Sequence, residues 1–262
     1  MRKNFTQTTS TQFNVVLFDL GSTLIYFDYA WTEISPKMYR ALYVSLYESG
    51  LNLDSSFLQN IDQYLDAYFQ EHVAEYVEQP MDKKLVRLLR EHGYQDVPDD
   101  VIQKAAKDMY KISQEHWHPE EDALPMLDVL KSSGYRIGII SNADYANDVE
   151  TLIDKGHFRP YMEIILISAR VGVRKPHPAM FQMALDYFKV AASQAVMVGD
   201  TLNADIAGAN QMGIASVWIC RRADRPDNNK QIGKIHPGAV IEKLSELPDL
   251  LMNWNTNPFA NS

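Results

Sequence analysis

Hydrophobic positions along the chain follow two periodicities, and these divide it into two kinds of structure. Residues 14–20 form an almost continuous apolar run, and similar runs occupy 135–140, 163–167, 195–198 and 214–219. Short apolar runs rich in Val and Ile are typical of strands buried on both faces of a parallel sheet. Between residues 28 and 118 the apolar positions instead recur every three or four residues, as in amphipathic helices. No convincing strand is expected there.

From residue 119 onward, predicted strands alternate with predicted helices. The helices cover 124–133, 149–155, 179–188 and 204–212, and a short strand at 238–241 precedes a last helix at 247–252. Such alternation predicts parallel βα units in an α/β fold with a doubly wound, Rossmann-like sheet. The early strand at 14–20 is too isolated to stand alone, so we expect it inside the same sheet.

The helical segment is then an insertion into the α/β unit. Ser35-Pro36 is a helix-start signal, and Met38, Leu42 and Leu46 follow at helical spacing until Gly50. Three further helical rows follow before residue 118. We therefore predict a core of residues 13–27 and 119–252 and an inserted helical cap of residues 28–118. A flexible tail of residues 1–12 and a polar tail of residues 253–262 complete the division.

Composition narrows the possible partners and the cellular location. The net charge of −9 disfavours nucleic acid or an anionic membrane as the main partner. One cysteine, Cys220, excludes an intrachain disulfide and a cysteine-based zinc site. The start has no apolar run of the secretory type, and no stretch approaches the roughly 20 apolar residues of a membrane span. A cytoplasmic protein, monomeric or homodimeric, is the expectation.

Polar groups stand at the ends of the predicted strands. Asp19 follows the first strand, Ser141 and Asn142 the second, and Asp200 the strand at 195–198, with Asp205 close behind. The carboxyl ends of parallel strands share one edge of the sheet, so these groups should converge there with Lys175 from a nearby loop. Carboxylates suit Mg²⁺, whereas a lysine and hydroxyl groups suit a phosphoryl group.

Four stretches at these positions resemble, in order, the motifs of haloacid dehalogenase-like hydrolases. They are Phe18-Asp19-Leu20-Gly21-Ser22-Thr23-Leu24, Ile140-Ser141-Asn142, Gly172-Val173-Arg174-Lys175-Pro176-His177-Pro178 and Val198-Gly199-Asp200-Thr201-Leu202-Asn203-Ala204-Asp205. The resemblance spans residues 13–27 and 119–252, and the helical insertion stands where that family carries its first type of cap.

The resemblance implies a role for each matching residue. Asp19 would be the nucleophile and a metal ligand, with Thr23 supporting its loop and Lys175 stabilising negative charge. Ser141 and Asn142 would contact the phosphoryl group. The Mg²⁺ ligands would be Asp19, the backbone carbonyl of Gly21, Asp200 and Asp205.

Gly21 departs from the phosphatases of this family, which usually carry a second aspartate there as general acid and base. Glycine keeps the carbonyl but loses the carboxylate, so the proton must come from another group or general acid catalysis is absent. Asp28, His72, His116 and His118 of the cap are candidates, although packing, hinge or helix-capping roles are favoured for each.

Several other residues allow a functional and a structural interpretation. The row Tyr39, Tyr43 and Tyr47 is expected to pack rather than to stack on a ligand. Arg221, Arg222 and Arg225 are expected to solvate a loop rather than touch an anionic substrate. Cys220 is expected to be a small buried side chain.

The leading hypothesis is a Mg²⁺-dependent phosphomonoester hydrolase that acts on a small phosphorylated metabolite through an aspartyl-phosphate intermediate. One alternative is a catalytically weak protein that binds metal and phosphate. Another is a carbon–halogen or phosphonate hydrolase, although Gly199-Asp200 disfavours dehalogenation. Lys37, the nearest cap lysine, lacks a motif that would support phosphonate cleavage.

Overall fold

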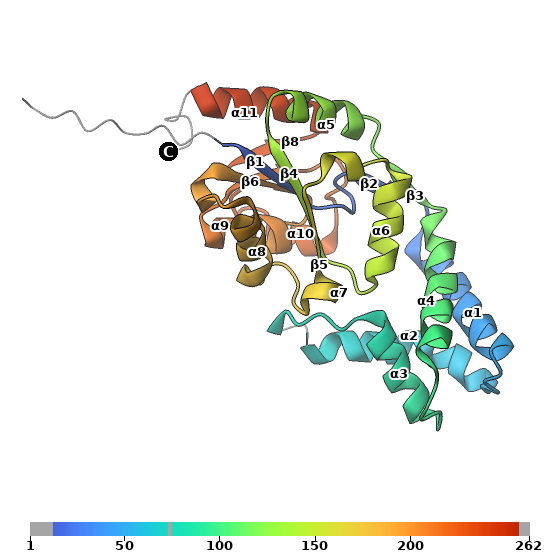
Figure 1. The fold of residues 1–262 in the computed structure, drawn as a ribbon. Coiled ribbons are helices and arrows are strands. Elements are labelled where there is room, and N and C mark those ends of the chain that lie inside the picture. Colours follow the sequence, from blue (N-terminus) through green and yellow to red (C-terminus); the bar gives the residue numbers. More distant parts are fainter. Residues whose placement is uncertain (1–12, 73–74, 257–262) are drawn as a thin grey trace, which may run out of the picture.

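A six-stranded parallel sheet forms the centre of the molecule, whose computed structural model describes residues 13–72 and 75–256 (Figure 1). The strand order is β5-β4-β1-β6-β7-β8. In β1, Val15 pairs with Arg136 on one side and with Ala195 on the other. The strands are β1 (Val15–Phe18), β4 (Arg136–Ser141), β5 (Ile164–Ile167), β6 (Ala195–Gly199), β7 (Ala215–Ile219) and β8 (Ala239–Ile241). The predicted doubly wound α/β fold is confirmed.

Helices cover both faces of this sheet, and successive residues of β1 alternate between the two faces. Val16 and Phe18 pack in one apolar cluster with α5 (Ala123–Ser132), α6 (Ala146–Lys155) and α11 (Leu247–Thr256). Val15 and Leu17 pack in the opposite cluster with α8 (Pro178–Phe188) and α9 (Ala207–Met212). Since both faces are buried, the strands need apolar residues at every position, which explains their continuous runs.

The inserted cap is a set of four helices with its own apolar core, seen below the sheet in Figure 1. They are α1 (Trp31–Glu48), α2 (Ser55–His72), α3 (Met81–Glu91) and α4 (Asp99–Gln114). The predicted start at Ser35 is wrong, because α1 begins one turn earlier at Trp31 and contains Pro36. The helix ends before Gly50, whose φ of 92° favours glycine.

Two short strands at the base of the cap were not predicted. β2 (Ile25–Phe27) pairs antiparallel with β3 (Trp117–Pro119), so that Phe27 lies opposite Trp117. The expectation of no strand between residues 28 and 118 is therefore wrong at its last residues. Strands of three residues carry too little periodic signal to be recognised, and each is defined by its partner across the insertion.

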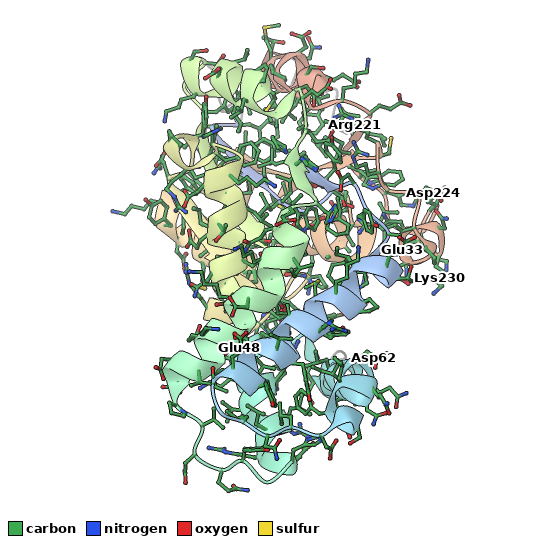
Figure 2. All side chains as sticks on the ribbon, turned by 90° about the vertical axis from the view of Figure 1, so that its right-hand side faces the viewer. Glu33, Glu48, Asp62, Arg221, Asp224 and Lys230 are labelled. Carbon is green, nitrogen blue, oxygen red and sulfur yellow. The ribbon has the colours of Figure 1, made fainter. Side chains whose placement is uncertain are left out.

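Polar contacts tie the cap to the core. The carboxylate of Asp144, in the loop after β4, lies 2.7 Å from Nζ of Lys84 in α3. Glu78 is buried and accepts a hydrogen bond of 2.7 Å from Ser168 Oγ. Within the core, directly after β3, the buried carboxylate of Glu120 pairs with Arg221 and Arg222. Figure 2 shows Arg221 on the core, well separated from Glu48 and Asp62 of the cap.

The remaining elements are short. They are α7 (Ser168–Val171), α10 (Pro226–Asn229), a π-helical turn at Leu202–Ile206 and 3-10 turns at Arg159–Tyr161, Ala192–Gln194 and Leu244–Glu246. The last helix, predicted to cover 247–252, runs to Thr256. The predicted tail at 1–12 lies outside the described residues, as do residues 257–262 of the other tail. None of the helices in the described ranges is both long and apolar enough to span a membrane.

Candidate functional site

The carboxyl edge of the sheet brings together the polar residues predicted from the strand ends. Asp19 directly follows β1, and its backbone N–H donates to the carbonyl of Val198 in the neighbouring β6. Its Oδ1 lies 2.7 Å from Lys175 Nζ. Its Oδ2 accepts a long hydrogen bond of 3.4 Å from the fully buried Thr23 hydroxyl. The first carboxylate is therefore held from two sides.

Lys175 is positioned by the end of β4. The side-chain oxygen of Asn142 accepts from the Lys175 backbone N–H at 2.7 Å, and the Asn142 amide donates to the Lys175 carbonyl at 2.9 Å. Lys175 Nζ also donates to the carbonyl of Ile140 at 2.6 Å and lies 2.7 Å from Asp205 Oδ1. The ammonium group is thus fixed between two carboxylates.

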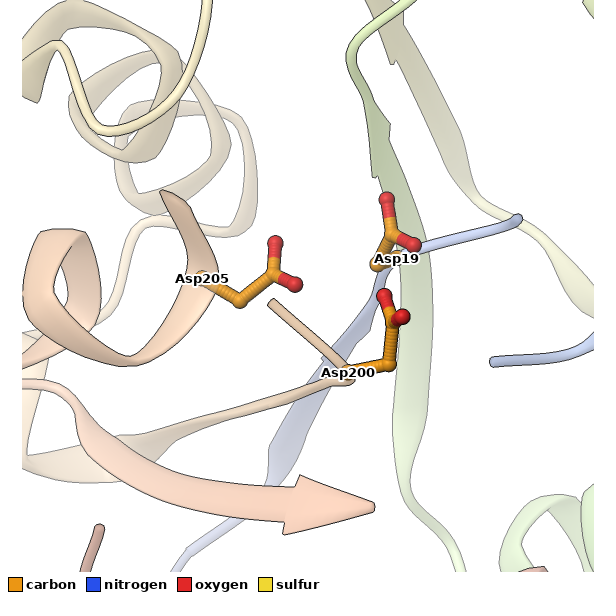
Figure 3. Close-up of side chains that lie close together, drawn as sticks. All are labelled: Asp19, Asp200 and Asp205. Carbon is orange, nitrogen blue, oxygen red and sulfur yellow. The ribbon is translucent and has the colours of Figure 1, made fainter. Parts of the chain in front are cut away.

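Three aspartates offer oxygen atoms to one point in space. Ligand atoms of Asp19, Asp200 and Asp205 all lie within 4.8 Å of one another, and Figure 3 shows the three side chains converging. Oδ2 of Asp200 and Oδ1 of Asp205 are buried and make no hydrogen bond within the described chain, although each has a cationic neighbour. Buried carboxylate oxygens in this arrangement fit a small, hard divalent cation such as Mg²⁺.

The backbone after β6 fixes the two later aspartates. The Thr201 N–H donates to Asp205 Oδ2 at 2.9 Å. The Asp200 carbonyl accepts from the Trp218 indole and the Asn228 amide, both at 2.9 Å. Gly199 is required here, because an added Cβ would lie 2.3 Å from Asp205 Oδ2. The glycine therefore provides the space into which the Asp205 carboxylate packs.

Burial and charge act together on the ionisable groups. Burial lowers the pKa of Lys175, but the charges of Asp19 and Asp205 outweigh it, so the pKa is raised and the ammonium stays protonated. Burial raises the pKa of Asp205 to about 6, although the Lys175 charge opposes this rise. A bound divalent cation would favour the ionised form of the same carboxyl.

These groups line a cavity of about 260 Å³, and two charged residues in its lining, Arg225 and Asp148, were not predicted as site residues. Arg225 forms an ion pair with Asp200, so the expectation that it merely solvates a loop is wrong. Asp148 enters from the first turn of α6 and is 8% exposed. The only sequence signal for either residue is its charge near a predicted strand end. The remaining predicted residues, Ser141, Asn142 and Gly21, line the same cavity.

Three of the candidates for a proton donor, Asp28, His116 and His118, do not line this cavity. Asp28 Oδ1 lies 2.9 Å from His116 Nδ1, and its Oδ2 lies 2.8 Å from His118 Nε2. The hydrogen bond with His116 is the main cause that lowers the pKa of Asp28. These three partly exposed residues thus connect the segment after β2 to the segment around β3, at the base of the cap. The side chain of His72 lies outside the described ones.

For the tyrosine row, the two arginines and Cys220, the structure also shows how far the expected structural role holds. Tyr43 packs beside Phe57, whereas Tyr47 is 58% exposed and Tyr39 lines a second cavity. The prediction that these tyrosines pack in the protein interior therefore holds for only part of the row. Arg221 and Arg222 bind Glu120 rather than solvate a loop. Cys220 is partly exposed, not buried.

A second cavity, of about 500 Å³, lies between the cap and the core. It shares Asn142 and Ala143 with the first cavity and is lined on the cap side by apolar and aromatic residues, among them Trp31, Met38, Tyr39, Leu65, Met81, Met109 and Tyr110. Lys84, Glu78, Arg174 and Asp144 add charged groups. The two cavities therefore adjoin at the loop after β4.

Comparison with known proteins agrees with this geometry. Residues 13–213 match the model of the haloacid dehalogenase-like hydrolases. The chain belongs to this family. The predicted enzyme class, a phosphatase-type hydrolase of the family, is confirmed as well.

Individual relatives cover most of the chain. It is 30% identical over 237 residues to glyceraldehyde 3-phosphate phosphatase from Methanopyrus kandleri, which covers 90% of this chain and 96% of that protein. Other phosphatase relatives match over about half of their own length. Among solved structures, a 2-haloacid dehalogenase from Pseudomonas syringae superposes with a TM-score of 0.62 at 27% identity, covering 93% of this chain and all of that one.

A further solved structure has the same fold as this protein. The magnesium-bound HAD-hydrolase YfnB from Bacillus subtilis superposes with a TM-score of 0.57 at 19% identity, covering 92% of this chain and 99% of that one. That structure is described as revealing interdomain movement.

Proposed function

We propose that this family member is a Mg²⁺-dependent phosphomonoester hydrolase that acts on a small phosphorylated metabolite through an aspartyl-phosphate intermediate. The single observation that carries the proposal is the placement of Asp19. The residue is 9% exposed and lines a cavity, and its carboxylate lies 2.7 Å from a buried lysine and beside two further aspartates. A carboxylate held in this way can attack phosphorus and carry the phosphoryl group.

Each neighbouring residue has a proposed task in that reaction. Asp19 attacks the phosphorus, and Thr23 restrains its carboxylate. Lys175 neutralises charge on the nucleophile and the transferred group, while Ser141 and Asn142 contact the phosphoryl oxygens.

The metal site is proposed from the same cluster. Asp19, Asp200, Asp205 and the backbone carbonyl of Gly21 would hold Mg²⁺, which would neutralise phosphoryl charge. Arg225 pairs with Asp200 and adds a further positive charge to the lining of the cavity. Support for the metal comes from the two buried carboxylate oxygens that lack hydrogen bonds within the described chain.

The substrate class is supported by the cavities and by the names of the relatives. The 260 Å³ cavity at the aspartates suits a phosphoryl group, and the cap-side cavity leaves room for a small alcohol portion. Sugar-phosphate and amino-acid-phosphate phosphatases occur among the relatives.

Hydrolysis of p-nitrophenyl phosphate by the full chain, with and without Mg²⁺, tests the proposal. We expect Mg²⁺-dependent release of phosphate that Asp19→Asn abolishes. Full activity of Asp19→Asn would exclude Asp19 as the nucleophile. Absence of turnover, together with thermal stabilisation by Mg²⁺ and a tetrahedral phosphate mimic, would instead identify a binding protein.

A carbon–halogen hydrolase is the second candidate, favoured by the superposition on the Pseudomonas syringae dehalogenase. Halide release from a 2-haloacid without added metal would support it against the phosphatase. Phosphonate cleavage has less support, since Lys37 is exposed and its ammonium lies over the Tyr29 ring, 4.9 Å from the ring centroid.

A further inference from the structure

The leaving group of a phosphate ester needs a proton, and Gly21 cannot supply one. The lining of the cavity at the aspartates contains two groups of residues. One group is the ion-paired charged residues, and the other includes Trp117 of β3 and residues on one face of α6. That face presents Asp148, Val149 and Leu152. An ionisable side chain therefore lies among apolar ones, where the alcohol portion of an ester would sit.

Asp148 differs from the other ionisable residues that line this cavity. Among the described residues, each of the other five forms an ion pair within the cavity: Lys175 pairs with Asp19 and Asp205, and Arg225 pairs with Asp200. Asp148 forms no ion pair in the described chain, and its Oδ1 accepts a hydrogen bond of 2.8 Å from the Gln114 amide. Its Oδ2 makes no hydrogen bond there and remains for a bound ligand.

The surroundings of Asp148 favour the protonated carboxyl. Burial raises its pKa to about 7, the Gln114 amide opposes this rise, and the charge of Asp144 adds to it. The other titratable groups that face it are Tyr110 of α4 and Tyr145 at the start of α6, and the pKa of each is itself raised, mainly by burial. None of these neighbours carries a positive charge that would favour the carboxylate.

We propose that Asp148 is the general acid and base of this site, the position left open by Gly21. The inference rests on the proposed phosphatase function. Asp19 attacks phosphorus, the bond between phosphorus and the leaving oxygen breaks, and that oxygen takes the Asp148 proton as the alcohol departs. Asp148, now ionised, takes a proton from water as the water attacks the phosphoryl group on Asp19. Phosphate leaves, and both carboxyl groups return to their starting forms.

The hydrogen bond with Gln114 connects Asp148 to the cap. Gln114 is the last residue of α4, and its carbonyl accepts a hydrogen bond of 2.6 Å from Lys155 at the end of α6. The same residue thus holds both ends of α6 against the cap. The proton donor is therefore in place when the cap is docked as it is here.

A series of aryl phosphates tests the proposal with the full chain and Mg²⁺. For Asp148→Asn, we expect less than ~10-fold loss of kcat/KM with p-nitrophenyl phosphate, whose leaving group needs little protonation. With phenyl phosphate we expect a loss of roughly 10²–10⁴-fold. Asp154→Asn, an exposed position on the same helix, is the matched control and should behave as wild type. Equal losses across the series, or none, would overturn the proposal.

The pH dependence of kcat/KM provides a second test. A purely structural role of Asp148 would not change this dependence. Wild-type kcat/KM for phenyl phosphate should fall above pH ~7, and this limb should be absent in Asp148→Asn. In Gln114→Met the limb should move to higher pH, because the amide that lowers the Asp148 pKa is gone. A limb unchanged in both variants contradicts the assignment.

Failure of this inference and failure of the proposed function give different results. If wild type and Asp148→Asn show the same leaving-group dependence while Asp19→Asn is inactive, the phosphatase stands and the acid lies elsewhere. If wild type hydrolyses no aryl phosphate, both are wrong.

Discussion

The indole of Trp117 lies against the open side of Gly21. A Cβ added to Gly21 would meet Trp117 Cη2 at 3.5 Å, which is an ordinary contact, and the backbone there does not require glycine. Position 21 can therefore accept a side chain, and the aromatic ring sets the limit on its length. The missing carboxylate is a property of this sequence rather than of the backbone.

This relationship predicts that Gly21→Asp provides a second proton donor. In the Asp148→Asn background, we expect Gly21→Asp to recover at least ~10-fold of the lost phenyl phosphate activity, because a positioned acid contributes roughly 10²–10⁴-fold. Gly21→Ala in the same background is the control and should recover nothing. A folded double variant without recovery would show that the indole prevents the productive orientation.

The buried carboxyl of Asp148 predicts a pH-dependent stability difference. The pKa of an unperturbed aspartate is 3.8, and that of Asp148 in the folded protein is about 7. The protonation of this carboxyl in the folded state therefore contributes fully to stability below about pH 4. This contribution is lost as the pH rises to about 7 and stays lost above. Asp148→Asn should therefore gain stability over wild type between pH ~4 and ~7, up to on the order of 4 kcal/mol.

Urea unfolding at a series of pH values measures this difference. Asp154→Asn should show no such gain, since that carboxyl is exposed. A constant difference between wild type and Asp148→Asn across the range would mean that Asp148 is not buried as a neutral acid.

Close packing at Gly199 predicts that Gly199→Ala weakens metal binding. The new Cβ would overlap the Asp205 carboxylate, which must move away from Asp19 and Asp200. We expect at least ~10-fold weaker Mg²⁺ binding, measured by calorimetry or by the Mg²⁺ dependence of the melting temperature. Gly50→Ala strains a remote glycine of the cap and should lower the melting temperature without changing the Mg²⁺ dependence.

The core directly after β3 contains Glu120, which is 5% exposed and pairs with Arg221 and Arg222. Removing its carboxylate leaves two partly exposed guanidinium groups without that partner. Glu120→Ala should cost roughly 1–3 kcal/mol of unfolding free energy in urea, because buried charged hydrogen bonds are lost. Glu121→Ala removes a neighbouring exposed carboxylate and should cost less than about 0.5 kcal/mol.

Local patterns and long-range contacts account for different parts of this protein. The apolar runs predicted the strands because a sheet covered on both faces imposes its composition on every position. Asp19, Asp200 and Asp205 could be predicted to converge because parallel strands end at one edge. The contacts of Arg225 and Asp148 follow instead from how a loop and a helix pack on that edge, and no local pattern encodes this.

The strand pair at the base of the cap illustrates the same limit. Ile25 to Phe27 becomes a strand only because Trp117 to Pro119 lies beside it, across the whole insertion. The position of Cys220 likewise depends on which neighbours cover the chain after β7. Such features are fixed by tertiary contacts between residues far apart in sequence.

The central place of β1 has a consequence for synthesis on the ribosome. This strand is made first, but its partners begin only at Arg136 and Ala195, after the entire cap. At 5–20 residues per second, β1 waits roughly 10–40 s for both neighbours. During that interval the cap helices can fold on local contacts while an apolar strand remains uncovered. The nascent chain is therefore most prone to aggregation, and most dependent on chaperones, at the strand that leads to Asp19.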